Sequence, residues 1–349
     1  MAYEAGDVNA PMRLSSARLV NSSIRLAELR FPCAHVHIPR TRLAFIHVDN
    51  LLHFAKIDRD GMVDGYVAAY LPDEVVLLLL RTGELANAIA IAQSGRVVLP
   101  IPTALDHIKQ ELERGELVYC DAPLQQLSWM YQSCAEPGKP KPVDDKQPER
   151  LFPALQHEAY SGIVELISDG RVNYVQLEDG AFTQAHFCDK PDEMPVSRYM
   201  EALFAHHENG APPDVAATVF SPAEDFPLQA SPELIQTYRD LFWAIAGKVD
   251  EETSGAGMKH VHHFRDLLGK IHTSLSVIGM PLGEHTDEIV VTAEELTFAL
   301  ADWTGQVLEQ VEIVAPGAGP NVVRDATREH RFVLQKAGYY DRLPWTVSW

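Results

Sequence analysis

Residues 75–80 read Val-Val-Leu-Leu-Leu-Leu, and residues 83–88, two positions further on, read Gly-Glu-Leu-Ala-Asn-Ala. An unbroken aliphatic run bounded by turn residues predicts a β-strand that is covered on both faces. The second stretch recurs downstream, because residues 180–185 read Gly-Ala-Phe-Thr-Gln-Ala and share its pattern of glycine, any residue, large apolar residue, two residues and alanine. A repeated supersecondary unit predicts two copies of one β-rich module.

The surroundings of the two stretches repeat as well. Each stretch has another glycine 18 residues earlier, Gly65 in the first copy and Gly162 in the second. Each then leads through a segment of helical period that begins at Pro100 or Pro195, and each ends in one more apolar run after a glycine. The repeat therefore covers a whole module of strands and helices and is not limited to a single turn.

Changes in composition and period divide the chain into six parts. We expect an α+β fold, with two tandem β-rich modules and flanking helices followed by a C-terminal region of four helices. The expected parts are an unassigned N-terminal arm (1–40), a first module (41–135), a Pro-rich linker (136–148), a second module (149–230), a helical bundle (231–338) and an aromatic tail (339–349).

The helical region carries explicit start signals. Ser231 followed by a proline, and Thr292 followed three residues later by Glu295, are typical of helix N-termini. Apolar residues at alternating spacings of three and four over 261–275 predict one continuous helix with a packed seam. A fourth helix is expected over 322–337, closed by Gly338.

The charge balance limits the classes of partner. The chain of 349 residues holds 49 acidic and 29 basic residues, a net charge of −20 with histidine neutral. Such a surface repels phosphate backbones and anionic lipid, so we expect no nucleic-acid and no membrane partner. The four cysteines have no Cys-x-x-Cys spacing, and the first residues lack the apolar stretch of a signal peptide. We therefore expect a cytoplasmic protein.

Both modules resemble the PATAN domain, the N-terminal domain of bacterial PatA-type response regulators. The resemblance rests on the glycines that enter the hairpin, Gly65 and Gly162, and on the turns at 83–88 and 180–185, and it covers roughly 41–125 and 149–222. That family has Thr or Ser before the entering glycine, where the first copy has Asp64. The resemblance implies protein–protein interaction in signalling, without catalysis, active-site residues or a cofactor.

Two histidine clusters offer an alternative. His260, His262 and His263 fall on an expected helix, and Cys33, His35 and His37 alternate along an expected strand. Imidazole and thiolate ligands on one face of an element suit zinc or iron. A metal-dependent enzyme or metal sensor is thus the competing hypothesis. We favour the simpler interpretation, in which the first cluster consists of polar residues beside the apolar seam of a helix and the second of partly buried strand residues. The sequence has no nucleophile motif and no phosphate-binding loop.

The last eleven residues contain four aromatic side chains, and this tail has two interpretations. Tyr340, Leu343, Trp345 and Trp349 would dock on a partner, because tyrosine and tryptophan dominate interface hot spots. Alternatively, the tail folds back on the chain's own helices, which we favour because a free aromatic tail promotes aggregation. The function predicted from the sequence is an adaptor that recognises another protein, with homo-oligomer formation or a structural role in a larger assembly as further options.

Overall fold

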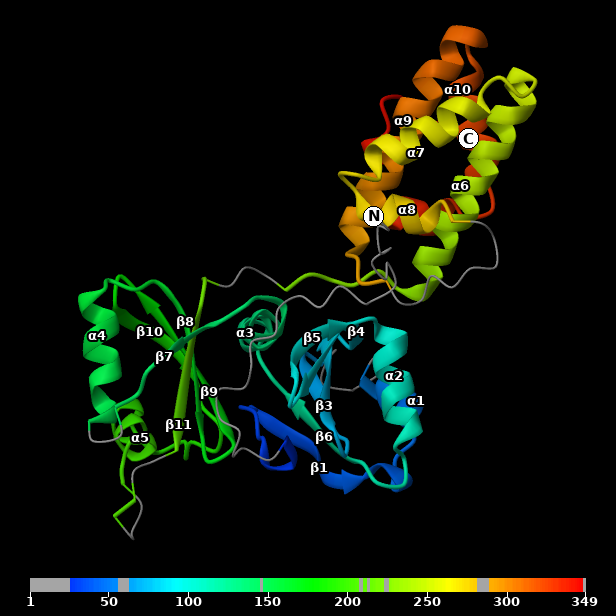
Figure 1. Cartoon of the computed structure of the whole chain (residues 1–349). Coiled ribbons are helices and arrows are strands. Elements are labelled where there is room, and N and C mark those ends of the chain that lie inside the picture. The colour runs from blue at the N-terminus through cyan, green and yellow to red at the C-terminus, as the bar shows by residue number, and fades with distance from the viewer. Residues whose placement is uncertain are drawn as a thin grey trace, which may run out of the picture. The chain divides into compact units, whose positions relative to one another are not determined.

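The structure is a computed structural model that describes residues 26–55, 63–144, 147–206, 210–211, 214–222, 226–280 and 289–347. The chain divides into two compact units, Met1–Pro227 and Leu228–Trp349 (Figure 1). Within the described residues, the first unit contains two antiparallel sheets and five α-helices, and the second contains six α-helices. The predicted α+β class is confirmed.

The first sheet has six strands in the order β1-β6-β2-β3-β4-β5, all antiparallel to their neighbours. Its strands are β1 (His35–Arg42), β2 (Gly65–Tyr70), β3 (Glu74–Arg81), β4 (Glu84–Ala92), β5 (Gly95–Leu99) and β6 (Glu116–Asp121). Its helices are α1 (Val48–Ala55), before β2, and α2 (Ile101–Gln110), between β5 and β6.

The second sheet has five antiparallel strands in the order β10-β9-β8-β11-β7. Its strands are β7 (Lys139–Lys141), β8 (Gly162–Ser168), β9 (Arg171–Glu178), β10 (Ala181–His186) and β11 (Val215–Phe220). Helix α4 (Leu151–His157) precedes β8, and α5 (Val196–Leu203) precedes β11. With β7 in the place of β1 and β11 in the place of β6, this is the topology of the first sheet without β5.

The repeated glycine stretches form the same turn in both copies. Thr82 and Gly83 have φ of 49° and 75°, and Asp179 and Gly180 have φ of 49° and 77°. Two successive residues with positive φ are the hairpin turn that fits the right-handed twist of the strands. Three residues after each glycine the strand register shifts, so that one extra residue stands opposite the partner strand. The spacing of the motif therefore encodes a turn followed by a β-bulge.

The two entering glycines also have one role. A Cβ at Gly65 would overlap the carbonyl oxygen of Cys120 on β6, and a Cβ at Gly162 would overlap that of Phe220 on β11. The close approach of the neighbouring strand therefore requires glycine at both positions. This close approach accompanies the pairing of β2 with β6 in the first copy and of β8 with β11 in the second.

The run 75–80 alternates between two cores. Val76, Leu78 and Leu80 pack with α1 and α2 on one face of the first sheet. The residues between them, Val75, Leu77 and Leu79, face a second core on the opposite side. The prediction of a strand covered on both faces is confirmed, because an apolar residue at every position has a core to enter.

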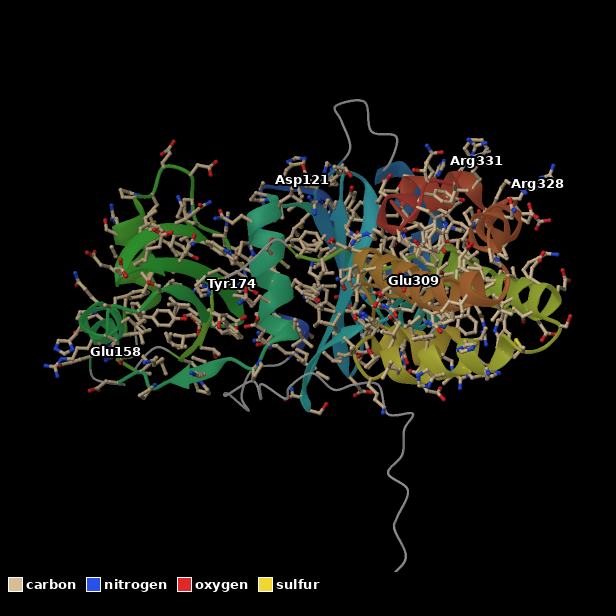
Figure 2. The ribbon with its side chains drawn as sticks, turned by 90° about the horizontal axis from the view of Figure 1, so that it is seen from above. Asp121, Glu158, Tyr174, Glu309, Arg328 and Arg331 are labelled. Atoms are coloured by element: carbon tan, nitrogen blue, oxygen red, sulfur yellow. The ribbon has the colours of Figure 1, made fainter. Side chains whose placement is uncertain are left out.

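Helix α3 (Leu124–Ala135) joins the two sheets (Figure 1). Its Leu127, Trp129 and Met130 lie in one core with residues of β2 and β3 from the first sheet and of β8 and β9 from the second. Tyr174 of β9 lies beside this helix, with its hydroxyl 3.5 Å from Ser133 Oγ (Figure 2). The outer face of each sheet has its own pair of helices, and α3 fills the space between the inner faces.

Two parts of this unit differ from the sequence-based expectation. The 136–148 segment, expected to be a linker, contributes β7, which pairs with β11 at the edge of the second sheet. The N-terminal arm contributes to the fold over its described part. Leu29 and Phe31 are buried in the core around α3, and Arg30 forms backbone hydrogen bonds to Gly170 and Val172 of the second sheet. Residues 1–25 of the expected arm lie outside the described residues.

The second unit is a bundle of helices around one apolar core. Its helices are α6 (Pro232–Thr253), α7 (Met258–Leu268), α8 (Thr273–Ile278), α9 (Ala293–Val314), α10 (Ala318–Thr327) and α11 (Arg331–Lys336). Both predicted caps are present, since Ser231 Oγ accepts from the Leu234 N–H at 3.2 Å and Thr292 Oγ1 accepts from the Glu295 N–H at 3.0 Å. Two long helices thus begin where the sequence predicts.

Two of the four expected helices are each divided in two. The apolar seam predicted over 261–275 breaks after Leu268, where Gly269 ends α7, and Ile271 between α7 and α8 is 71% exposed. The helix expected over 322–337 is split into α10 and α11 by a turn at 328–330. Alternating apolar spacing alone does not distinguish one long helix from two short ones that pack on the same core.

Candidate interaction surfaces

The histidine cluster at 260–263 lies on α7. His262 and His263 are exposed, and the His263 ring lies against Phe264 at 5.2 Å between centroids. These side chains flank the buried Val261. Within the described part of the chain, no group of three or more His, Cys, Asp or Glu side chains is arranged to hold a metal ion. The structure places His260, His262 and His263 on one helix, and the described residues add no further ligand to them.

The second predicted cluster separates into two pairs. The rings of His35 and His37 are 5.1 Å apart on β1, and His37 Nε2 is paired with the Asp121 carboxylate of β6. Cys33 precedes the strand, and its thiol interacts with the thiol of Cys120 on β6. Within the described residues, Cys33, His35 and His37 are therefore not arranged as one set of metal ligands.

The Cys33–Cys120 pair is asymmetric. Cys33 is exposed, whereas Cys120 is buried. A hydrogen bond from the Cys120 thiol lowers the pKa of Cys33 to about 7, against the opposing effect of burial. The same bond, together with burial, raises the pKa of Cys120. The negative charge of a thiolate therefore resides on Cys33, the more accessible sulfur.

The aromatic tail packs into the bundle over its described part. Tyr339, the residue before the predicted docking set, is fully buried, and its hydroxyl lies 2.9 Å from Thr304 Oγ1 of α9. Leu343 belongs to the same core, and Tyr340 and Trp345 pack against it. This arrangement corresponds to the intramolecular alternative for Tyr340, Leu343 and Trp345. Trp349 lies outside the described residues.

One residue of the tail contributes to the surface. The Arg342 guanidinium lies 5.6 Å from the centre of the Phe298 ring of α9, and the His272 ring meets the same phenyl ring edge-on at 5.3 Å. Phe298 is 46% exposed, and the neighbouring Ile271 is more exposed still. We refer to Ile271, His272, Phe298 and Arg342 as the Phe298 patch. It combines an exposed aromatic ring, the arginine and the histidine that contact this ring, and the exposed isoleucine that precedes the histidine in the chain.

Acidic side chains surround the Phe298 patch. Glu294, one turn before Phe298 on α9, accepts from Arg342 Nη2 at 3.1 Å. Asp302, one turn after it, lies 3.8 Å from His272 Nε2. Both carboxylates hold a cationic or imidazole group against the phenyl ring. The patch is therefore an ordered surface with an apolar centre and a charged rim.

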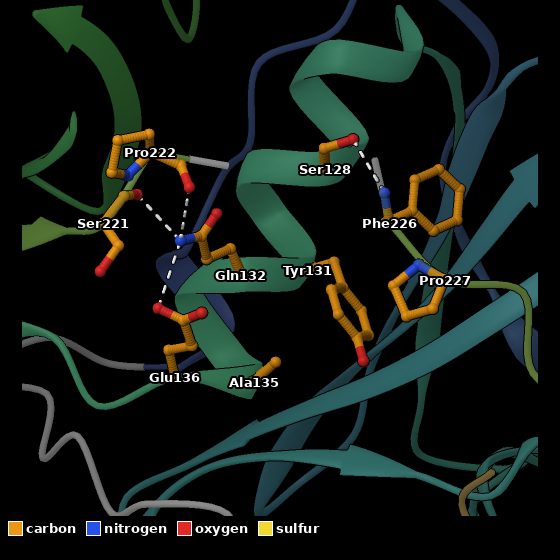
Figure 3. A pocket seen from close by; sticks show the side chains of 9 residues that line it. All are labelled: Ser128, Tyr131, Gln132, Ala135, Glu136, Ser221, Pro222, Phe226 and Pro227. Atoms are coloured by element: carbon orange, nitrogen blue, oxygen red, sulfur yellow. Dashed lines mark hydrogen bonds between the residues drawn. The ribbon is translucent and has the colours of Figure 1, made fainter. Parts of the chain in front are cut away.

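A groove in the first unit runs beside α3 (Figure 3). It has a volume of about 310 Å³ and lies between the helix and the segment that follows β11. Gln132 Nε2 donates to the carbonyl oxygen of Ser221 at 2.8 Å and to the Glu136 carboxylate at 3.2 Å, and Ser128 Oγ accepts from the Phe226 N–H at 3.3 Å. Its polar groups thus bind each other across the groove and attach this segment to α3.

Comparisons with known proteins add no relative. No family model matches the chain, and neither a curated protein nor a solved structure matches it. None of the helices in the described residues is long and apolar enough to span a membrane. Interpretation of the surfaces therefore rests on their own geometry and chemistry.

Proposed function

We propose that this chain is a non-catalytic adaptor or regulatory protein of the bacterial cytoplasm that recognises another protein in signalling. The observation that carries the proposal is the Phe298 patch on the helical bundle. Its exposed phenyl ring is held between Arg342 and His272, so the surface is ordered before a partner arrives. A preorganised surface loses less conformational entropy on binding than a mobile one.

The composition of the patch supports a protein partner. Aromatic and arginine side chains are enriched in the buried centres of protein interfaces, and a polar rim surrounds such centres. Phe298 supplies the apolar centre, and Glu294 and Asp302 supply the rim. Ile271, next to His272 in the chain, adds a largely exposed aliphatic side chain. Covering a half-exposed phenyl ring and a largely exposed isoleucine contributes about 1–2 kcal/mol for each residue.

The repeated modules support the placement in signalling. The resemblance of the two copies to the PATAN domain implies a protein-binding role, and the equivalent turns, bulges and entering glycines support the duplication on which that resemblance depends. The net charge of −20 favours a partner with a basic surface, since opposite charges accelerate association and orient the two proteins.

The test is capture of a partner with matched variants of the full-length chain. The chain and its Phe298→Glu and Phe332→Glu variants are immobilised and exposed to a lysate of the source organism, and each retained protein is purified and titrated by calorimetry. Phe332 is an ideal control, because it lies on α11, outside the patch, and is 81% exposed. We expect Phe298→Glu to weaken binding at least about tenfold, a loss of about 1.4 kcal/mol, and Phe332→Glu to leave it unchanged. Equal affinity of all three proteins would contradict the proposal.

A further inference from the structure

The two sheets of the first unit have four edges, and three of them are protected against further pairing. Edge strand β1 contains Pro39 followed by Arg40 and Arg42, and β7 reads Lys-Pro-Lys. Edge strand β5 is mostly buried and packs against α3. Proline, lysine and coverage by a helix are the usual protections of a sheet edge. The fourth edge strand, β10, reads Ala-Phe-Thr-Gln-Ala-His and carries no proline, lysine, arginine or carboxylate.

Strand β10 is exposed along most of its length. Its first four residues are exposed, and among them Phe182 is 48% exposed. One side of β10 pairs with β9, and in the described residues no strand pairs with the other side. The hairpin closes with the two-residue Asp179–Gly180 turn, so Ala181 and Glu178 form the hydrogen-bonded pair next to it. Phe182, the next residue, therefore directs its N–H towards the open side.

The first copy shows what happens at the equivalent edge. There β4 continues to Ala92, and β5 pairs with it from Ala88 onwards. Ala88 lies five residues after the turn glycine, as Ala185 does in the second copy. Strand β10 ends at His186, and the chain continues to α5 without forming a strand beside β10 that would correspond to β5. The same fold thus carries an additional strand in one copy and leaves the corresponding edge open in the other.

The surroundings of β10 define the chemistry of an incoming strand. Phe182 and Ala185 pair with Leu177 and Val175 on the apolar face of the sheet, whereas Gln184 pairs with Gln176 on the other face. Exposed carboxylates stand at both ends of the strand. They are Glu178 and Asp179 before it, and Asp192 and Glu193 after it, together with Asp189, which already pairs with Arg30 at 2.5 Å. A complementary segment is uncharged in the middle, alternates apolar and polar residues, and has lysine or arginine at its ends.

We propose that β10 binds an extended segment of another protein, with basic ends, as a sixth strand of the second sheet. The inference rests on the proposed function, since it specifies a second surface by which the chain recognises a protein. Main-chain hydrogen bonds supply the affinity, and the alternating side chains and the terminal charges supply the selectivity.

The test uses the full chain and a fluorescein-labelled peptide, Lys-Val-Thr-Val-Thr-Val-Lys, with binding followed by fluorescence anisotropy. We expect saturable binding that weakens at least tenfold in Phe182→Pro, which removes the outward N–H, and less in Phe182→Ala, which keeps it. A peptide with glutamate ends should bind several-fold more weakly, and a peptide N-methylated at alternate residues should not bind. Absence of saturable binding up to millimolar peptide, or equal binding by the N-methylated peptide, overturns the inference.

Hydrogen exchange provides a readout that does not depend on a variant. The Phe182 amide should exchange rapidly in the free chain and become protected when the peptide is added. Protection in the free chain at every protein concentration would show that the chain covers its own edge. Protection that appears only at high concentration, together with a dimer by sedimentation, would identify a second copy as the occupant. Either result overturns the inference. The proposed function is tested separately, through a partner whose binding depends on Phe298. It would therefore stand even if no other protein pairs with β10.

Discussion

Arg96 of β5 and Glu165 of β8 form a buried bidentate ion pair that joins the two sheets of the first unit. The distances are 2.7 Å from Nη2 to Oε1 and 2.8 Å from Nη1 to Oε2, and the side chains are 6% and 1% exposed. Burial opposes the charged guanidinium, but the Glu165 carboxylate outweighs it and the pKa of Arg96 is raised. This deeply buried bidentate pair connects the two sheets through both terminal nitrogens of Arg96, whereas the buried Arg96 Nε has no hydrogen-bond partner within the described residues.

Removing one partner of this pair should destabilise the first unit strongly. Arg96→Met leaves the Glu165 carboxylate buried without its cation, for which we expect a loss of about 3–5 kcal/mol in urea unfolding. The double variant Arg96→Met/Glu165→Leu should recover most of that loss, because no charge then remains buried. Arg114→Met, which breaks the exposed Arg114–Glu111 pair, is the control and should cost less than about 1 kcal/mol. A single variant as stable as this control would contradict the prediction.

Asp64 and Ser161 occupy equivalent positions in the two copies, and either side chain should be able to accept the hydrogen bond from the turn. Asp64 Oδ1 accepts from the Thr82 N–H at 2.6 Å, and Ser161 Oγ accepts from the Asp179 N–H at 2.9 Å, each just before the turn glycine. We expect Asp64→Ala and Ser161→Ala to cost about 1 kcal/mol each in thermal unfolding, and Asp64→Ser to restore the stability lost in Asp64→Ala. If Asp64→Ser were as unstable as Asp64→Ala, the two copies would not share this hydrogen bond.

The duplication could be predicted from the sequence because its signals are local. A turn that needs positive φ, a bulge three residues later and a glycine beneath a neighbouring carbonyl each demand particular residues at fixed spacing. Where the two copies differ in sequence, the different side chains can make the same contact. The Asp64 carboxylate and the Ser161 hydroxyl each accept a hydrogen bond from the backbone N–H of the residue before the turn glycine.

Helix α3 could not be predicted in the same way. It lies between two sheets, and its buried residues include Gln126, Ser128 and Gln132 besides its apolar side chains. A helix covered on most sides lacks the polar face that gives an amphipathic helix its periodic pattern. Strand β7 was mistaken for part of a linker for a related reason. An edge strand of three residues that reads Lys-Pro-Lys has the composition of an exposed segment.

The Phe298 patch was missed although a signal for it exists. Phe298 lies off the buried stripe of Leu296, Leu300 and Trp303, and Glu294 and Asp302 lie one turn to either side of it. A large aromatic residue on the polar face of a helix indicates a surface role. Its contacts with Arg342 and His272 depend on tertiary packing, which the sequence pattern does not specify.

The reactivity of Cys33 should depend on Cys120. Because the pKa of Cys33 is lowered to about 7, its alkylation by iodoacetamide should be half-maximal near pH 7, whereas a free thiol reaches that point near pH 8.5. Cys120→Ala removes the hydrogen bond that favours the thiolate, so the midpoint should move to higher pH. Peptide mass spectrometry of the alkylated chain gives the rate at Cys33 alone. Cys134→Ala, a change at a buried cysteine of α3, is the control, and a midpoint unaffected by Cys120→Ala would refute the assignment.

The tail should stabilise the bundle through Tyr339. This ring is fully buried, lies 6.1 Å from the Tyr238 ring of α6, and its hydroxyl meets Thr304 Oγ1 of α9. Tyr339→Ala leaves a cavity between these helices and removes one hydrogen bond of the Thr304 hydroxyl, which still donates to the Leu300 carbonyl at 2.8 Å. We therefore expect a loss of about 3–5 kcal/mol in urea unfolding, mainly from the cavity. Phe332→Ala, which removes an exposed ring only seven residues away, should change the stability by less than about 0.5 kcal/mol. Equal effects of the two changes would mean that the tail is not docked on the bundle in solution. Its aromatic side chains would then be available to a partner, as in the first of the two interpretations of the sequence.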